Sequence, residues 1–339
     1  MKKYLISDSG NFYKANLHCH STISDGRLTP EQLKKAYMEH GYSILAYTDH
    51  DALIGHNDLT DENFLALNGF EVEITEGMGD MGKDCHICFV ALKPDNLIQP
   101  CYHRTEYMYT NEKNYRDQVL FDESKPDFER IYSPECISQM MKEGRDNGFF
   151  VTYNHPTWSM ETYNEYSKYE HMHAMEICNY GCVAYGWPEY NEKEYDEMLR
   201  CGKRIFCISA DDNHNCHPPQ SRHYDSFGGF IMVKAERLEY KTVTDALLAG
   251  NFYASQGPEI YDLWLEDEKL YITCSNASSI VLGTGRRRVK AVYRENGEAL
   301  TKACFDIKKE DIYVRITVTD HSGLHANTNA YFTDELLRD

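Results

Sequence analysis

The sequence predicts an α/β fold with a barrel-like site, followed by a small antiparallel β domain. Over about the first 255 of the 339 residues, short apolar segments typical of strands alternate with segments typical of helices, which favours a parallel sheet. Polar residues cluster at the end of each strand-like segment, as they do around the site of a barrel. A doubly wound open sheet shows the same alternation, but its glycine-rich phosphate turn is missing here, which favours the barrel.

The individual elements begin and end at recognisable residues. Thr29 is a helix N-cap, Pro30 stands at the first helical position, Gln32 completes a capping box, and Gly41 ends the helix. The same reasoning predicts a strand at 43–48, a helix from Ser133 to near Gly148, a strand at 149–153, a helix at 188–200, a strand at 204–209 and a last helix at 242–249.

Two segments depart from this alternation. Residues 93–132 are rich in Tyr, Asn, Asp and Glu, and an insertion of that length is either functional, for example with His103 closing over a substrate, or a solvated loop. After Gly257 the pattern becomes short alternating strands, at 260–265, 270–274, 289–293 and 312–319. We therefore expect a first domain at 1–256 and a small β-sandwich domain at 257–339.

The charge of the chain limits its partners. The formal net charge is −19, which disfavours binding to a nucleic-acid backbone or to an anionic membrane surface. We therefore expect neither a nucleic-acid polymer nor a membrane as a partner. A small anionic substrate at a local metal cluster remains compatible with this charge, and a homo-oligomer is left open.

Cysteine usage indicates the compartment. The chain has 12 cysteines but is far larger than the small secreted domains that depend on disulfides. Its N-terminus has no apolar run of signal-peptide length, and no stretch approaches the length of a membrane span. We expect a cytoplasmic protein with reduced thiols.

Histidines and carboxylates at the strand ends predict a metal site. His18 and His20 are two residues apart, so on an extended strand their imidazoles point to the same face, and Asp25 follows closely. Further candidates stand after later strands: His50, Glu71 or Glu73, His86, His155, Asp211 or Asp212, and His214. Together these supply enough ligands for two or three divalent metal ions, and mixed imidazole and carboxylate ligands suit Zn, Mn or Fe.

The ordered motifs resemble those of a known family. His18-x-His20 with Ser24-Asp25-Gly26, then Thr48-Asp49-His50-Asp51, Gly69-Phe70-Glu71, Asn154-His155-Pro156 and Asp212-x-His214 are similar to the PHP (polymerase and histidinol phosphatase) family of metal-dependent phosphoesterases. Residues 248–255 also resemble the end of the PHP domain in two-domain bacterial members. The resemblance implies a distorted (β/α)7 barrel with its metal cluster at the carboxyl ends of the strands.

The resemblance also implies a ligand set. A first metal would be held by His18, His20, Glu71 and Asp212, a second by Glu71, His86 and His155, and a third by Asp25, His50 and His214. Other members have a histidine in place of Asp25, which leaves the filling of the third position open. Glu71 is preferred to Glu73 because it lies two residues after the glycine, and Asp212 to Asp211 because it lies two before His214. Glu73 and Asp211 would then orient histidines.

The chemistry implied by this set is hydrolysis of a phosphate ester. Three divalent ions would outweigh the three carboxylates, so the pocket would be locally positive, and a metal-bridging hydroxide would attack phosphorus in line. Nucleotides and sugar or amino-alcohol phosphates are the candidate substrates. Arg222 and Arg27 are candidate phosphate contacts, although either is equally well an ordinary surface arginine.

Two other functions stay open. An amidohydrolase-like C–N hydrolase would share the barrel and the metals, but such enzymes usually bring a carboxylated lysine or a single late aspartate. A non-catalytic metal-binding module, with the β domain as its interaction surface, is the non-enzyme alternative. A decayed site would have lost several ligands, and here every ligand type is present.

Overall fold

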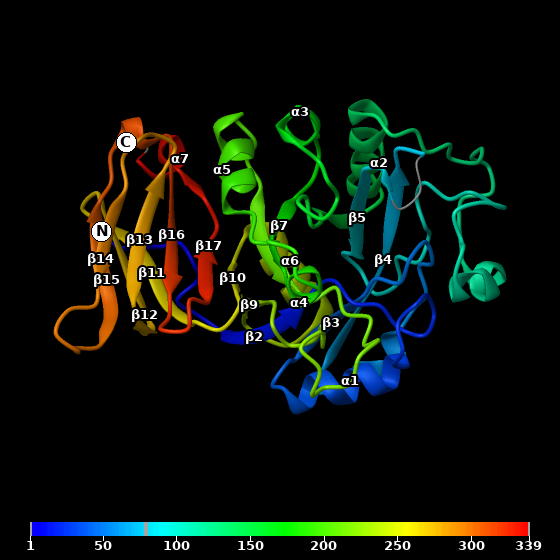
Figure 1. The fold of residues 1–339 in the computed structure, drawn as a ribbon, viewed down its shortest axis with the longest axis horizontal. Helices are drawn as coiled ribbons and strands as arrows, with labels where there is room; N and C mark the ends of the chain where they lie inside the picture. The colour runs from blue at the N-terminus through cyan, green and yellow to red at the C-terminus, as the bar shows by residue number, and fades with distance from the viewer. Residues whose placement is uncertain (1, 78–80, 338–339) are drawn as a thin grey trace.

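The computed structural model describes residues 2–77 and 81–337, and Figure 1 shows its ribbon. The first part of the chain supplies the strands that lead to the site, which are β2 Asn11–Asn16, β3 Ile44–Tyr47, β4 Leu65–Thr75, β5 Asp84–Ala91, β6 Phe149–Tyr153, β7 Ala174–Asn179, β8 Phe206–Ala210, β9 Phe230–Ala235 and β10 Phe252–Ser255. The predicted strands at 43–48, 149–153 and 204–209 correspond to β3, β6 and β8.

These strands form one large mixed sheet in the order β10-β9-β2-β3-β4-β5-β6-β7-β8. The expectation of a parallel sheet holds for β2 with β3 and β4, and for β6 with β7 and β8. It is wrong for β9, which runs antiparallel to both β2 and β10, and for β5, which runs antiparallel to both β4 and β6. For β5, the physical reason is the connection from β4 to β5, at 76–83, which is too short for a parallel crossover.

Helices cover the sheet. They are α1 Pro30–Glu39, α2 Pro134–Asp146, α3 Tyr163–Tyr166, α4 Tyr180–Ala184, α5 Glu192–Arg200, α6 Tyr240–Ala249 and α7 Thr333–Leu336, with short 3-10 turns η1 Asn57–Leu59, η3 Asn111–Gln118 and η4 Lys309–Asp311. Figure 1 shows α2, α3 and α5 along the upper side of the view and α1 along the lower side. Within the two described ranges, none of these helices has the length and apolar character that a bilayer crossing requires.

The helix ends agree with the predicted caps, with one exception. The amide of Gln32 donates to the Thr29 side chain at 3.3 Å and the amide of Thr29 donates to the Gln32 side chain at 2.9 Å, so the capping box is confirmed. The helix predicted from Pro188 begins only at Glu192. Glu189, within the predicted helix start, instead binds the loop after β6, because its carboxylate accepts the amide protons of Thr157 and Trp158.

The insertion at 93–132 is folded against the sheet. It contains η3 and buries a small apolar cluster that includes Tyr102 and Met108. His103 is 8% exposed, and its Nδ1 accepts the amide protons of Thr105 and Glu106. The ring therefore closes a local turn of the insertion, and a contact of His103 with a substrate stays a prediction.

The C-terminal part adds β11 Ile260–Glu266, β12 Lys269–Ala277, β13 Ser279–Thr284, β14 Lys290–Tyr293, β15 Leu300–Asp306, β16 Tyr313–Thr319, β17 His325–Thr328 and β18 Tyr331–Phe332. A second antiparallel sheet is present, as predicted, in the order β1-β11-β12-β15, where β1 is Lys3–Tyr4 at the other end of the chain. The remaining C-terminal strands extend the large sheet, because β17 pairs with β10 and with β16.

The two sheets pack against each other through a core of their own. Its buried side chains include Leu263 and Ile272 of the second sheet and Ile280 and Ile316 of the large sheet. A larger core lies between the other strands and their helices. The domain boundary between 256 and 257 stays a prediction, although the hydrogen bonds from β17 to β10 carry the large sheet across it.

Candidate metal centre

The strand ends bring nine predicted side chains into three overlapping groups. Within each group, one nitrogen or oxygen atom per residue lies within 4.8 Å of the others. The first group is His18, His20, Glu71 and Asp212; the second is Glu71, His86 and His155; the third is His20, Asp25, His50 and His214. The third contains His20 in addition to the three residues expected there.

Glu71 lies at the centre of the cluster. Its side chain is buried on β4, and its two oxygens face five imidazoles. The nitrogen-to-oxygen distances are 3.0 Å to His18, 3.3 Å to His20, 3.4 Å to His50, 3.2 Å to His86 and 3.7 Å to His155. A carboxylate in this position can bridge two cations.

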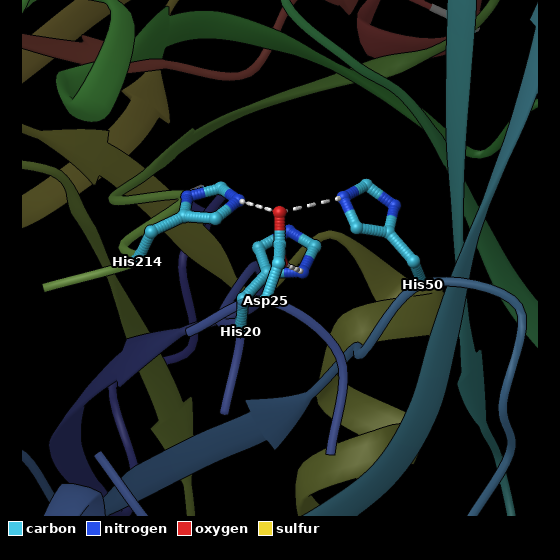
Figure 2. Close-up of side chains that lie close together, drawn as sticks. All are labelled: His20, Asp25, His50 and His214. Carbon is cyan, nitrogen blue, oxygen red and sulfur yellow. Dashed lines mark ion pairs between the residues drawn. The ribbon is translucent and has the colours of Figure 1, made fainter. Parts of the chain in front are cut away.

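Asp212 and Asp25 occupy opposite sides of His20. Asp212 Oδ1 is 3.1 Å from His18 Nε2 and 3.0 Å from His20 Nε2. Figure 2 shows Asp25 between the rings of His214 and His50, with distances of 3.4 and 3.9 Å to their Nε2 atoms. Asp25 therefore completes a separate, more exposed group.

The two members of each ambiguous pair lie in different surroundings. Glu73 lies opposite His86 across the β4–β5 ladder, where its carboxylate is 3.9 Å from His86 Nε2. Asp211 points away from the cluster and accepts hydrogen bonds from the hydroxyl of Tyr37 and from the amides of 227–229. Asp212 is thus the member of its pair that joins a group. Glu71 belongs to the first two groups, whereas Glu73 forms a fourth group with Asp84 and His86.

Backbone hydrogen bonds between the segments that follow β2 and β8 align the first group. The amide of Asp212 donates to the His18 carbonyl at 3.0 Å, and the amide of His20 donates to the Asn213 carbonyl at 3.1 Å. Asp212 and His155 also adopt positive φ angles of 51° and 24°. Non-glycine residues in such conformations are strained, and strain of this kind concentrates at functional sites.

Groups outside the nine hold the imidazoles in place. His18 Nδ1 donates to Glu176 Oε1 at 2.8 Å, which leaves its Nε2 directed at Glu71 and Asp212. Glu176 Oε2 accepts the amide proton of His155 at 2.9 Å, and Asn154 donates to Glu71 at 2.8 Å. A carboxylate behind a ligating histidine is a recurrent feature of metal sites.

The sequence contains a signal for Glu176 that strand-end motifs do not detect. Glu176 is a charged residue inside the apolar strand β7 and is fully buried. A buried carboxylate needs partners, and here it has three: the ring of His18, the backbone amide of His155 and the side-chain amide of Asn179. Asp49 has a comparable role, since its carboxylate accepts hydrogen bonds from the amides of Ser21 and Ser24 and holds the loop that carries Asp25.

A model of the PHP domain family matches residues 16–213, from the strand before His18 to the residue before His214. This chain belongs to the PHP domain family. The match contains eight of the nine clustered residues, and His214 follows it directly.

Individual proteins resemble this PHP protein either over a short segment or at low sequence identity. A 5′-3′ exoribonuclease of Haemophilus influenzae is 38% identical over 65 residues, which are 19% of this chain and 22% of the relative, so the match spans about a fifth of the relative's length. A two-domain protein from Bacteroides vulgatus that contains a predicted PHP-like metal-dependent phosphoesterase aligns over 96% of this chain and 98% of its own, with 15% identity and a TM-score of 0.46. An amidohydrolase from Chromobacterium violaceum with bound sulfate aligns over 61% and 89%, with 16% identity and a TM-score of 0.40.

The carboxylates of the PHP site control its protonation. Burial lowers the pKa of His18 and His20, but the charges of Asp212 and Glu71 outweigh it, so the pKa of each imidazole lies well above its usual value. The pKa of His86 is raised in the same way, mainly by Glu71 against the effect of burial. Burial and the neighbouring His20 instead lower the pKa of His50 to about 3.

The residues of the PHP site fit divalent metal ions. His50 Nδ1 and Glu71 Oε2 are buried without a hydrogen-bond partner among the described residues. Such atoms are costly to bury unless something else coordinates them. The imidazole and carboxylate donors match the preferences of Zn, Mn and Fe, and the protons held by His18 and His20 are those that a metal ion would displace.

Seven of the nine clustered residues, all except His18 and His20, line a cavity of about 540 Å³. Glu73 and Asp84 also line it. The sequence suggested three carboxylates at the site, but five line this cavity, which are Asp25, Glu71, Glu73, Asp84 and Asp212. Arg27 and Arg222 are exposed, and neither is among the described residues that line the cavity. An aromatic wall that the sequence did not predict consists of Trp158, Tyr185 and Trp187.

Proposed function

We propose that this PHP protein is a metal-dependent phosphoesterase that hydrolyses a phosphate ester of a small molecule. The observation that carries the proposal is the position of Glu71, which lines an open cavity and whose carboxylate lies within 3.7 Å of five imidazoles. A carboxylate shared by two groups of imidazoles would hold two metal ions close together, as two-metal hydrolysis needs.

The chain's own residues would bind and orient the metal ions. His18, His20 and Asp212 would hold one ion with Glu71, and His86 and His155 a second with the same carboxylate. When bound, divalent ions supply the Lewis acidity that activates water near neutral pH and stabilises charge on a phosphoryl oxygen.

Neighbouring side chains would keep these ligands in place. Glu176 fixes the proton of His18 at Nδ1, so that Nε2 would be the atom available to a metal ion. Trp158 packs against the rings of His86 and His155 with centroid distances of 5.1 and 4.8 Å and would exclude water from that side. Asp25, His50 and His214 are proposed to hold a third ion, and Arg27 and Arg222 stay predictions as phosphate contacts.

We also propose that β2 to β8 form the distorted seven-stranded barrel that the family resemblance implies. The supporting observation is the parallel bridge between Cys19 and Asn213, which links the extensions of β2 and β8. A cytoplasmic location is proposed on the basis of cysteine usage, and all twelve cysteines are free thiols in the described structure.

The test combines metal analysis with a phosphate-release screen. The purified protein is stripped with a chelator, reloaded with Mn²⁺, Zn²⁺ or Fe²⁺, and assayed on nucleotides, sugar phosphates and amino-alcohol phosphates. We expect metal-dependent phosphate release. Release of phosphate from none of these esters would reject the proposal, and cleavage of an amide panel instead would favour the amidohydrolase alternative.

A matched pair of variants assigns the activity to the site. Glu71→Gln should lose bound metal, because it removes the charge shared by the two groups of imidazoles. We expect kcat/KM to fall by about a hundredfold or more, which corresponds to about 2.7 kcal/mol of transition-state stabilisation. Glu161→Gln is the control, because Glu161 is also a buried glutamate but binds the hydroxyls of Tyr132 and Tyr153 outside the cluster. Its metal content should equal that of the unmodified protein.

A further inference from the structure

Three of the residues that line the cavity are aromatic. Trp158, Tyr185 and Trp187 line it together with the metal-site residues. Tyr185 and Trp187 follow α4, directly after the strand that carries Glu176. Two of the three tryptophans in the sequence line this cavity.

The two outer rings of the aromatic wall are exposed. Tyr185 is 48% exposed and Trp187 is 38% exposed, although both belong to residue types that proteins usually bury in large part. Tyr185 stacks at an interplanar angle of 25° on His223, and Trp187 stacks on no other ring of the described chain. Trp158, in contrast, is packed edge-on against His86 and His155. An unstacked indole at the rim of a cavity has a free face for a planar ligand.

The charge of the lining restricts the anionic part of a ligand. Five carboxylates line the cavity, and its described lining has neither lysine nor arginine. With two divalent ions bound, the five carboxylates would leave the lining with a net negative charge. With three ions bound, the positive charge would exceed that of the carboxylates by only one. Polyphosphates and nucleic-acid chains need several cationic contacts, which such a lining does not offer.

We propose that the substrate carries a single phosphoryl group on a planar ring system, as in a nucleoside monophosphate, with the ring against Trp187 and Tyr185 and the phosphate over Glu71. This inference rests on the proposed phosphoesterase function and names its substrate class. Stacking of a base on an aromatic side chain is tolerant of ring identity, so the wall selects a planar ring without selecting one particular base.

The first test measures binding without catalysis. Adenosine 5′-monophosphate is titrated into the metal-reloaded protein, with Ca²⁺ as the ion, while tryptophan fluorescence is recorded. We expect quenching that is lost in Trp187→Phe and retained in Trp264→Phe, whose indole stacks on Tyr271 in the second sheet. Ribose 5-phosphate should not quench. Equal quenching by both compounds, or none by either, would overturn the inference.

The second test measures selectivity. The ratio of kcat/KM for adenosine 5′-monophosphate to that for ribose 5-phosphate should fall at least tenfold in Trp187→Ala, a factor that corresponds to about 1.4 kcal/mol. Trp187→Phe should recover most of it. Tyr293→Ala, an exposed tyrosine on β14, is the matched control and should leave the ratio unchanged.

The outcomes separate this inference from the proposed function. Phosphate release with equal kcat/KM for both esters, unaffected by Trp187→Ala, would reject the aromatic subsite and leave the phosphoesterase in place. Selective quenching without phosphate release from any ester would support the subsite and reject the phosphoesterase. Turnover of adenosine triphosphate or a short oligoribonucleotide at or above the rate for the monophosphate would contradict the single-phosphoryl part.

Discussion

His18 donates its Nδ1 proton to the buried carboxylate of Glu176 at 2.8 Å, and that carboxylate also accepts the amide proton of His155. One side chain thus positions a ligand from each of the first two groups of the cluster. Glu176 therefore supports residues of two of the proposed metal positions.

Replacing Glu176 should weaken metal binding without abolishing it. Glu176→Gln keeps a hydrogen-bond acceptor but removes the charge that fixes His18, and such changes behind a ligand typically cost about 10–100-fold in metal affinity. Competition with a chromophoric chelator measures the effect. A metal affinity within twofold of the unmodified protein would show that Glu176 has no positioning role.

Asp25 should control only the third metal position. Asp25→Ala is expected to lower the Mn²⁺ content by one ion per chain, because Asp25 contacts His50 and His214 but lies outside the first two groups. Asp25→His should restore the ion, since an imidazole can replace a carboxylate as a ligand of such metals. Metal content by mass spectrometry decides this; an unchanged content in Asp25→Ala would mean that the third position is not filled.

Metal binding should release protons, and the effect has a definite sign. The pKa values of His18, His20 and His86 are raised by neighbouring carboxylates, so below these values the metal-free imidazoles hold protons that an ion must displace. Affinity should therefore increase as the pH rises through the raised pKa values and then level off. Calorimetry in buffers of different ionisation enthalpy measures the protons; an affinity independent of pH between 5 and 9 would contradict the prediction.

The same shifts predict how the metal-free protein responds to pH. Raised histidine pKa values stabilise the folded state below the unfolded value of about 6.5, and this stabilisation is lost as the pH rises through the folded values. The gain in Tm on adding Mn²⁺ should therefore be larger at alkaline than at mildly acidic pH. Thermal unfolding followed by circular dichroism at both pH values tests this, and an equal gain at both would contradict it.

The insertion at 93–132 should depend on a buried ion pair for its attachment. Arg130 donates to Asp51 at 3.1 Å and to the Glu73 carbonyl at 2.9 Å, and both charged side chains are almost fully buried. Arg130→Met should cost about 3–5 kcal/mol, because it leaves the Asp51 charge buried and unpaired. The double change with Asp51→Asn should recover part of this.

Urea unfolding measures these values, and the chain offers a control. Lys125 and Glu143 form an ion pair that is half exposed, so Lys125→Met should cost less than about 1 kcal/mol. A cost for Arg130→Met as small as that of Lys125→Met would show that the insertion does not depend on the buried pair.

Local sequence signals predicted much of the fold. Thr29 with Gln32 marks a helix start within a few residues of the chain, and short apolar runs that end in polar residues locate β3, β6 and β8. The antiparallel direction of β5 and the pairing of β1 with β11 depend on partners far away in the sequence or on loop length, so no local pattern contains them. The continuation of the large sheet through β17 likewise depends on a partner strand, β10, that is far away in the sequence.

Part of the candidate site was likewise predicted from local sequence signals, and part was not. His18, His20 and His214 were found because ligands of a metal cluster follow strand ends, and the structure brings them together with Glu71 and Asp212. Their role as ligands stays a prediction. The aromatic wall was not found, because Tyr185 and Trp187 lie in an irregular segment after a short helix, where no periodicity shows which way a ring points.

The most direct test of the central claim is a crystal structure of the protein with Mn²⁺, with anomalous diffraction recorded at the manganese edge. Two strong anomalous peaks should lie on either side of the Glu71 carboxylate, each at about 2.0–2.3 Å from its ligand atoms. One should contact His18, His20 and Asp212, and the other His86 and His155. Peaks that do not contact Glu71, or a manganese-soaked crystal without a peak in this cavity, would contradict the assignment of this cluster as a metal centre.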